Sequence, residues 1–87
     1  EVREAIEGYI LLVLACAFDS PSDVPAYLAR AAELADSLAD PLDKQQVAYV
    51  KGRFENDAQV REAAKGWLEQ AGYGHFVMRI ENILTNL

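Results

Sequence analysis

Residues 2–18 read VREAIEGYILLVLACAF, and at 100° per residue they predict a helix that is apolar almost all round in its second half. Proline cannot continue a helix interior, so Asp19-Ser20-Pro21 is expected to end this helix. A second apolar face, turned by roughly 130° from the first, holds Leu11, Leu14 and Phe18. The first face collects Val2, Ile6, Tyr9, Ile10, Val13 and Ala17, and the far flank carries Leu12 and Cys16.

The next part of the chain carries start signals for two more helices. Asp23 can cap a second helix with Pro25 in its first turn, and this helix is expected to run to about Leu38. Asp40-Pro41 places a capping acid before a proline at the first helical position. A third helix is therefore expected from this pair to about Phe54.

Two further helices are expected after it. Asn56 or Asp57 caps a fourth helix ending near Ala71, and 72–74, Gly-Tyr-Gly, supplies a left-handed C-terminal cap. The last helix starts at about Phe76. The chain holds 14 alanines and 10 leucines, and no stretch alternates with period two. The sequence therefore predicts one all-α domain over residues 1–87, a compact bundle of four to five short helices.

The later helices each show an apolar stripe that is expected to face the core. The stripes are Val24, Tyr27, Leu28, Ala31, Leu34, Ala35 and Leu38; Val47, Val50 and Phe54; Val60, Ala63, Ala64, Trp67, Leu68 and Ala71; and Phe76, Ile80, Ile83, Leu84 and Leu87. Gly8, Gly52 and Gly66 fall inside expected helices, where glycine costs roughly 1 kcal/mol against alanine. Close helix contact is the explanation favoured for these three glycines.

The first helix has more apolar surface than one core-facing stripe needs, and two interpretations stay open. Either the other helices wrap it on all sides, or its second face meets a partner protein or a second copy of the chain. Tyr49 and Met78 lie off the apolar stripes of their own helices, and this favours an interface. The predicted partner-binding residues are Leu11, Leu14, Phe18, Tyr49 and Met78.

Charge is unevenly divided along the chain. Residues 1–43 hold nine acids and two bases, a local charge of −7, and residues 44–87 hold five acids and six bases, a local charge of +1, which sum to −6. A solvated surface explains this imbalance, and so does selection of a partner with complementary charge. The negative total argues against a basic nucleic-acid binder. The third and fourth helices could still imitate a helix-turn-helix bearing Arg61 and Lys65, and the acidic half could mimic DNA.

The residue types that carry most chemistry are scarce. One cysteine, Cys16, excludes an internal disulfide, and together with the one histidine, His75, it cannot make a zinc site of four N/S ligands. We expect Cys16 to be a buried thiol and His75 a capping or surface residue. The glycines match no phosphate-binding fingerprint. No enzyme activity, cofactor, metal or catalytic residue is therefore predicted.

The longest apolar run covers nine residues, 10–18, whereas a membrane-spanning helix needs about 20. The acidic start, 1–4, is unlike a signal peptide, which carries positive charge before its apolar stretch. The chain starts at Glu1 rather than Met, which leaves room for an upstream segment. These features predict a cytoplasmic domain that does not enter a membrane.

In whole-chain character the sequence resembles the small all-helical antiactivators of bacterial quorum sensing, of the QslA type found in pseudomonads. The apolar run 10–14, the Ala-rich segment 31–35 and the close formed by Trp67 and 72–74 carry this resemblance. It implies binding to a LuxR-type transcriptional regulator and a block of its dimer or of its DNA binding. Because no specific motif is shared, the resemblance assigns no functional residue.

The sequence therefore predicts a small regulator that works by stoichiometric protein–protein binding, with the apolar first helix as anchor. The chain is also expected to form a homodimer through the same apolar surface. The alternative is an acidic immunity or anti-defence protein that neutralises a toxin or nuclease. Direct nucleic-acid binding is not expected.

Overall fold

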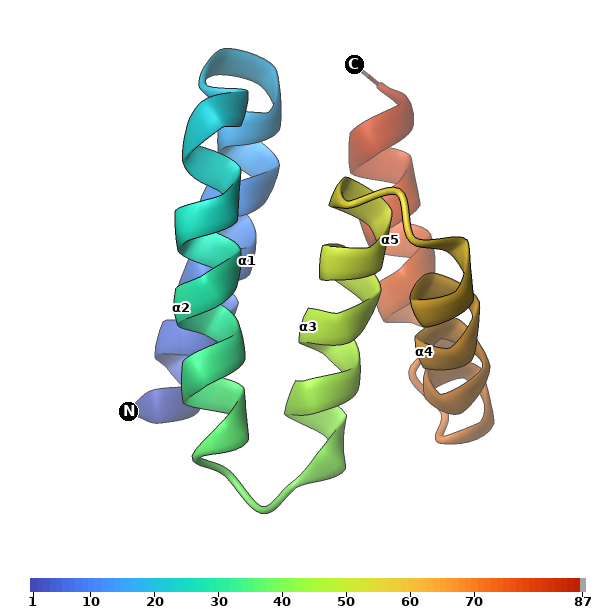
Figure 1. The fold of residues 1–87 in the computed structure, drawn as a ribbon. Helices are drawn as coiled ribbons and strands as arrows, with labels where there is room; N and C mark the ends of the chain where they lie inside the picture. The colour runs from blue at the N-terminus through green and yellow to red at the C-terminus, as the bar shows by residue number, and fades with distance from the viewer. Residues whose placement is uncertain (87) are drawn as a thin grey trace.

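The computed structural model describes residues 1–86 and contains five α-helices (Figure 1). In chain order these are α1 (Val2–Asp19), α2 (Val24–Asp36), α3 (Pro41–Phe54), α4 (Ala58–Gln70) and α5 (Gly74–Thr85), with a single 3-10 turn, η1 (Pro21–Asp23), between α1 and α2. The predicted all-α bundle is confirmed. Leu87, which the sequence assigns to the core, lies outside the described residues.

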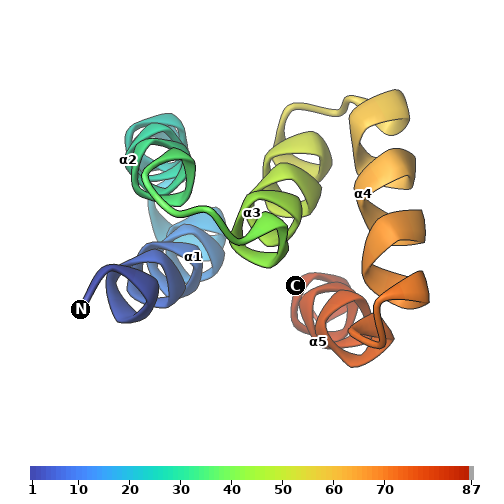
Figure 2. The same cartoon turned by 90° about the horizontal axis from the view of Figure 1, so that it is seen from below.

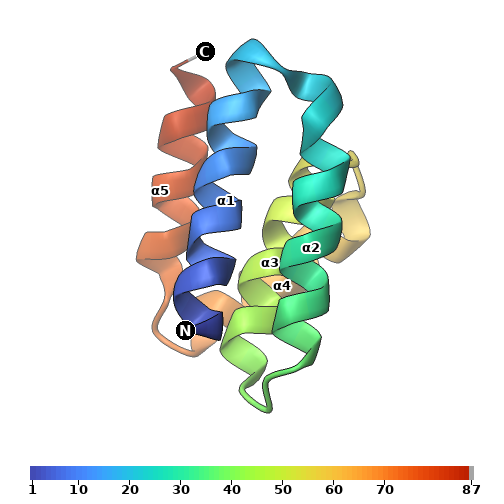
Figure 3. The ribbon, with the colours of Figure 1, turned by 90° about the vertical axis from the view of Figure 1, so that its left-hand side faces the viewer.

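Four of the helices are roughly aligned and α4 crosses them. Figure 2 shows α1, α2, α3 and α5 nearly end-on, whereas α4 is seen along its length. The helices α1 and α2 form one antiparallel hairpin, and α3 packs against both. The helix α5 packs on α3 and α4, and it runs beside α1 in the same direction (Figure 3).

Side-chain caps fix the starts of α3 and α4 where the sequence predicts them, whereas Asp23, the predicted cap of α2, makes no side-chain capping hydrogen bond. The Asp40 side chain accepts a hydrogen bond from the Leu42 amide at 2.9 Å, and the Asp57 side chain accepts one from the Val60 amide at 3.2 Å. Both satisfy amide donors that have no partner inside the helix. Gly72 has a φ of 92°, the left-handed conformation expected at a helix C-terminus.

One hydrophobic core receives side chains from all five helices. Its apolar members are Ile6, Ile10, Val13, Leu14, Val24, Leu28, Ala31, Ala35, Val47, Tyr49, Val50, Ala64, Leu68, Val77, Ile80 and Leu84. The predicted stripe of α2 is confirmed. The stripe of α4 is narrower than predicted, because Val60 and Ala63 are exposed at its first turns while Ala64 and Leu68 are buried. On α5, Val77 is buried although the sequence analysis left it out of the stripe.

The three helix glycines differ in their surroundings. A Cβ on Gly52 would lie 2.8 Å from the Arg61 amide nitrogen, so the lack of a side chain lets α3 and α4 approach at this point. The predicted close contact is thus confirmed for Gly52. It is wrong for Gly8 and Gly66, since a Cβ on either would meet no atom within 4 Å.

Within residues 1–86, no helix combines the length and the apolar content that a membrane crossing requires.

Candidate functional site

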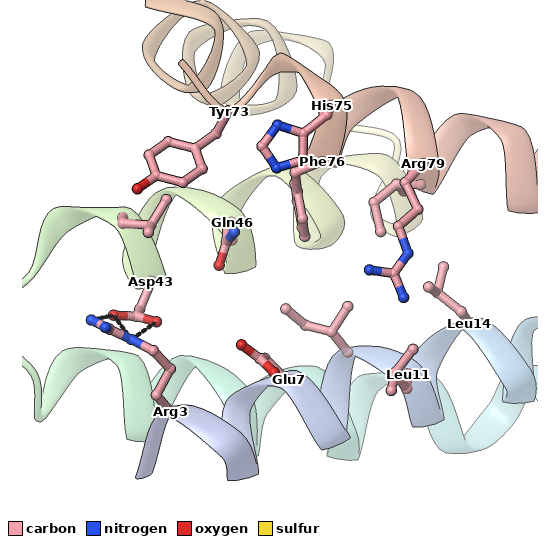
Figure 4. Close-up of a pocket in the computed structure, with 13 residues that line it drawn as sticks. Arg3, Glu7, Leu11, Leu14, Asp43, Gln46, Tyr73, His75, Phe76 and Arg79 are labelled. Atoms are coloured by element: carbon pink, nitrogen blue, oxygen red, sulfur yellow. Dashed lines mark hydrogen bonds and ion pairs between the residues drawn. The ribbon is translucent and has the colours of Figure 1, made fainter. Parts of the chain in front are cut away.

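A cleft of about 320 Å³ lies between α1, α3 and α5 (Figure 4). Its apolar part is formed by Ile10 and Leu14 of α1 and by Phe76 and Ile80 of α5. The helices α1 and α5 form opposite walls of the cleft, and the closest backbone neighbours of α1 are α2, η1 and α3. Side chains alone fill the space between the first and last helices, and they fill it incompletely.

An ion pair closes one end of this cleft. Arg3 donates to Asp43 through Nη2 at 2.8 Å to Oδ2 and through Nε at 3.1 Å to Oδ1, and it also reaches Asp40 Oδ2 at 3.0 Å. Asp43 is only 2% exposed, so Arg3 is the charge partner of a buried carboxylate. The hydrogen bonds and the negative charge of Asp43 raise the pKa of the Arg3 guanidinium above its ordinary value. This pair ties the start of α1 to the start of α3.

Polar side chains from opposite walls line the rest of the opening. Glu7 of α1 and Arg79 of α5 both point toward the space between the helices (Figure 4). Both residues are exposed, and within residues 1–86 neither takes part in an ion pair. His75 and Tyr73 stand at the same end of α5, with ring centroids 5.9 Å apart. The cleft thus has an apolar floor, an acid on the α1 wall and a cation on the α5 wall.

A second polar cluster holds α5 against α3. The buried Tyr49 hydroxyl donates to Glu81 Oε2 at 2.5 Å, and Arg53 Nε lies 3.2 Å from the same oxygen. Burial, and then the bond and charge of Glu81, raise the pKa of the Tyr49 hydroxyl. By fixing α5 on α3, this cluster fixes the position of one wall of the cleft.

The five predicted partner-binding residues separate into three groups. Leu11 and Phe18 are exposed, at 53% and 46%, and Leu11 lines the cleft. Met78 is 67% exposed and lies on α5, so it is on a different helix from the other two. Leu14 and Tyr49 are buried at 4% and 2%, although Leu14 lines the cleft, and their role in binding a partner stays a prediction.

The burial of Leu14 and the burial of Tyr49 have different physical reasons. Leu14 is covered because α3 and α5 close over the side of α1 that it occupies, which a helical wheel of α1 alone cannot show. Tyr49 is buried because it lies on the side of α3 that meets α5, where its hydroxyl donates to the half-exposed Glu81 carboxylate. Leu12, at 42% exposure, adds an apolar residue on the opposite flank of α1.

Several residues of the cleft were not predicted from the sequence. Asp43 reads as an ordinary first-turn acid of α3, and Arg3 as an ordinary surface base, because their partnership spans 40 positions. A signal was available for Arg79, the one base in an otherwise uncharged run from Gln70 to Ile80. Arg61 and Lys65, proposed for a helix-turn-helix, are both half-buried on α4, which fits poorly with a free recognition helix.

The lone histidine and the lone cysteine differ in their position relative to the cleft. His75 lines it and Cys16 does not. Across residues 1–86, no cluster of three or more His, Cys, Asp or Glu side chains could hold a metal ion. The chemistry that the cleft offers is apolar contact with one charge of each sign at its edges.

Comparison of the chain with protein-family models, with curated proteins and with solved structures finds no match.

Proposed function

We propose that this protein is a stoichiometric protein-binding regulator, an antiactivator that binds a LuxR-type transcriptional regulator and blocks its dimer or its DNA binding. The observation that supports the proposal is the exposed apolar edge of α1 formed by Leu11, which also lines the cleft, and Phe18, which does not. The expectation of a LuxR-type partner rests on the resemblance in chain character described above.

The edge has the composition of a docking surface. Leu11 and Phe18 are seven positions apart and therefore share one side of α1. Leu11 stands beside an apolar floor that a partner side chain can enter, and such pockets usually hold the strongest contacts of an interface. Amphipathic helices bind grooves of this kind with apolar anchors at helical spacing. We expect the regulator to present a helix or an apolar loop to the cleft.

The proposal is tested by titrating the protein into a complex of a LuxR-type regulator with its DNA. We expect release of the DNA at close to one equivalent, and a Kd for the regulator that rises at least tenfold in Leu11→Asp. Val60→Asp is the matched control, because Val60 is a similarly exposed apolar residue, at 40%, on α4. Far-ultraviolet circular dichroism of both variants should equal that of the wild type.

Two results would contradict the proposal. The protein could leave the regulator–DNA complexes intact at large excess, or Leu11→Asp and Val60→Asp could weaken binding equally. The second result would mean that binding does not use the cleft edge.

A specific observation also keeps the immunity alternative open. Eight of the nine acids in residues 1–43 are exposed, and Asp43 is the exception. A neutraliser acting through these acids should lose affinity for its toxin or nuclease steeply between about 50 and about 500 mM salt. An interface centred on Leu11 should keep most of its affinity over that range.

A further inference from the structure

We infer that in the free protein the side of the bundle formed by α1 and α5 is covered by a second copy of the chain, in a two-fold dimer whose axis runs along the groove between these helices. We call this side the α1–α5 face. It comprises the exposed residues Glu4, Glu7, Leu11, Ala15 and Phe18 of α1 and His75 and Arg79 of α5. The inference goes beyond the proposed function and does not depend on a LuxR-type partner.

Charge on the α1–α5 face is divided between its two edges. The α1 edge carries the exposed acids Glu4 and Glu7 in its first half, and the α5 edge carries Arg79 and His75. Glu7 and Arg79 point from opposite walls toward the same space, yet no ion pair joins them within the chain. In the described part of the molecule both charges are available to a second molecule.

The direction of the two helices determines which symmetric pairing suits these charges. Since α1 and α5 run the same way, a two-fold axis along the groove sets α1 of one copy over α5 of the other at the same level. Because a two-fold interface uses the same patch on both copies, every contact occurs twice. The α1 edge of each copy, which carries Glu7, then faces the α5 edge of the other, which carries His75 and Arg79.

The other face-to-face pairing, with the axis across the groove, fails on charge. It sets α1 against α1 in antiparallel fashion and brings the acids Glu4 and Glu7 of one copy toward the Asp19 end of the other. No cation of α1 faces them, because Arg3 is already bound to Asp43. Like charges in such proximity oppose association. The charge pattern therefore selects the axis along the groove.

Burial supplies the driving force and charge the specificity. Leu11 and Phe18 leave water when the two faces meet, as large apolar side chains do at the centre of stable interfaces. A specific interface buries about 800 Å² on each partner, which is roughly 15% of the 5216 Å² surface of this chain.

Sedimentation velocity of single and mixed variants tests the inference. The dimer of the wild type should appear as the protein concentration is raised from about 1 to about 500 µM. Glu7→Arg and Arg79→Glu should each raise the dimer Kd at least tenfold, because each places like charges opposite one another in both symmetric contacts. An equal mixture of the two variants should return the dimer, since the mixed pair regains one Arg–Glu contact on each side.

Two controls separate surface charge from position. Asp36→Arg on α2 and Lys51→Glu on α3 make the same changes of charge at exposed residues away from the α1–α5 face, and both should dimerise as the wild type does. Circular dichroism of every variant should show wild-type helicity.

Three outcomes would overturn the inference. These are a wild type that stays monomeric at about 500 µM, a dimer indifferent to both charge reversals, and restoration in the double variant Glu7→Arg/Arg79→Glu but not in the mixture. The last would assign the charge pair to a single chain. A monomer that still releases a regulator from DNA contradicts only the dimer, whereas a dimer that binds no regulator contradicts only the proposed function.

Discussion

Arg3 and Asp43 lie 40 positions apart in the sequence, and two nitrogens of the Arg3 guanidinium hold both oxygens of the buried Asp43 carboxylate. The pair joins α1 to α3 and closes one end of the cleft. Arg3 itself is 45% exposed, so water reaches the outer side of the pair while the carboxylate stays shielded. Because it joins the two helices at fixed atoms, the pair sets the position of α1 on α3 as well as adding to stability.

Arg3→Met should therefore destabilise the protein more than an ordinary surface substitution. The change leaves the buried Asp43 carboxylate without its charge partner, so the free energy of unfolding should fall. Urea denaturation measures the loss. Arg3→Met combined with Asp43→Leu should cost clearly less than Arg3→Met alone, and a double variant no more stable than the single one would contradict this account.

Leu11→Asp and Leu14→Asp should differ sharply although the two residues are three positions apart. Leu14 is 4% exposed, and a carboxylate there should cost more than about 4 kcal/mol, enough to unfold a domain of this size. Leu11 is 53% exposed, so Leu11→Asp should remain folded. Thermal unfolding followed at 222 nm distinguishes them, and a folded Leu14→Asp would show that the core is arranged differently.

Gly52→Ala and Gly66→Ala form a matched pair on the two helices of the α3–α4 hairpin. The methyl group at position 52 would meet the Arg61 backbone at 2.8 Å, and this overlap should cost about 1–3 kcal/mol. At position 66 it meets nothing within 4 Å, so alanine should stabilise α4 by about 0.5–1 kcal/mol. Equal effects of the two changes in urea denaturation would argue against the close approach of α3 and α4.

The Tyr49 hydroxyl should make stability fall in alkaline solution. Its pKa is raised above the ordinary value of 10.0, first by burial and then by Glu81. At a pH between 10.0 and the raised pKa, the hydroxyl has lost its proton in the unfolded chain but keeps it in the folded chain. The contribution of Tyr49 to the free energy of unfolding is therefore full below about pH 10 and declines as the pH rises further. Tyr49→Phe should show a smaller loss of stability between pH 9 and pH 11 than the wild type, and equal slopes would contradict this.

The sequence was informative wherever the cause of a feature is local. Asp40, Asp57 and Gly72 act within one helical turn, so the residue type and its neighbours suffice to place the helix ends. The same reasoning identified the core stripe of α2, which has a single apolar side.

Tertiary features were not accessible in this way. The helix α1 is apolar on several sides, and only the positions of α3 and α5 decide that Leu14 is covered and Leu11 is not. Arg3 and Asp43 carry no sequence mark of their partnership, and the partnership of Tyr49 with Glu81 spans 32 positions. The cleft is a property of how helices from both halves of the chain meet, and a pattern read along one helix does not contain it.

Because the walls of the cleft come from α1 and α5, the whole of α2, α3 and α4 must be synthesised before the second wall exists. During translation the α1–α2 hairpin can form early from local contacts. Ile10 and Leu14 then lack the α5 wall of the cleft until the last helix has left the ribosome. A nascent chain therefore exposes more apolar surface than the complete folded protein. Any partner or chaperone that engages α1 at that stage would meet it in a form that the mature protein no longer presents.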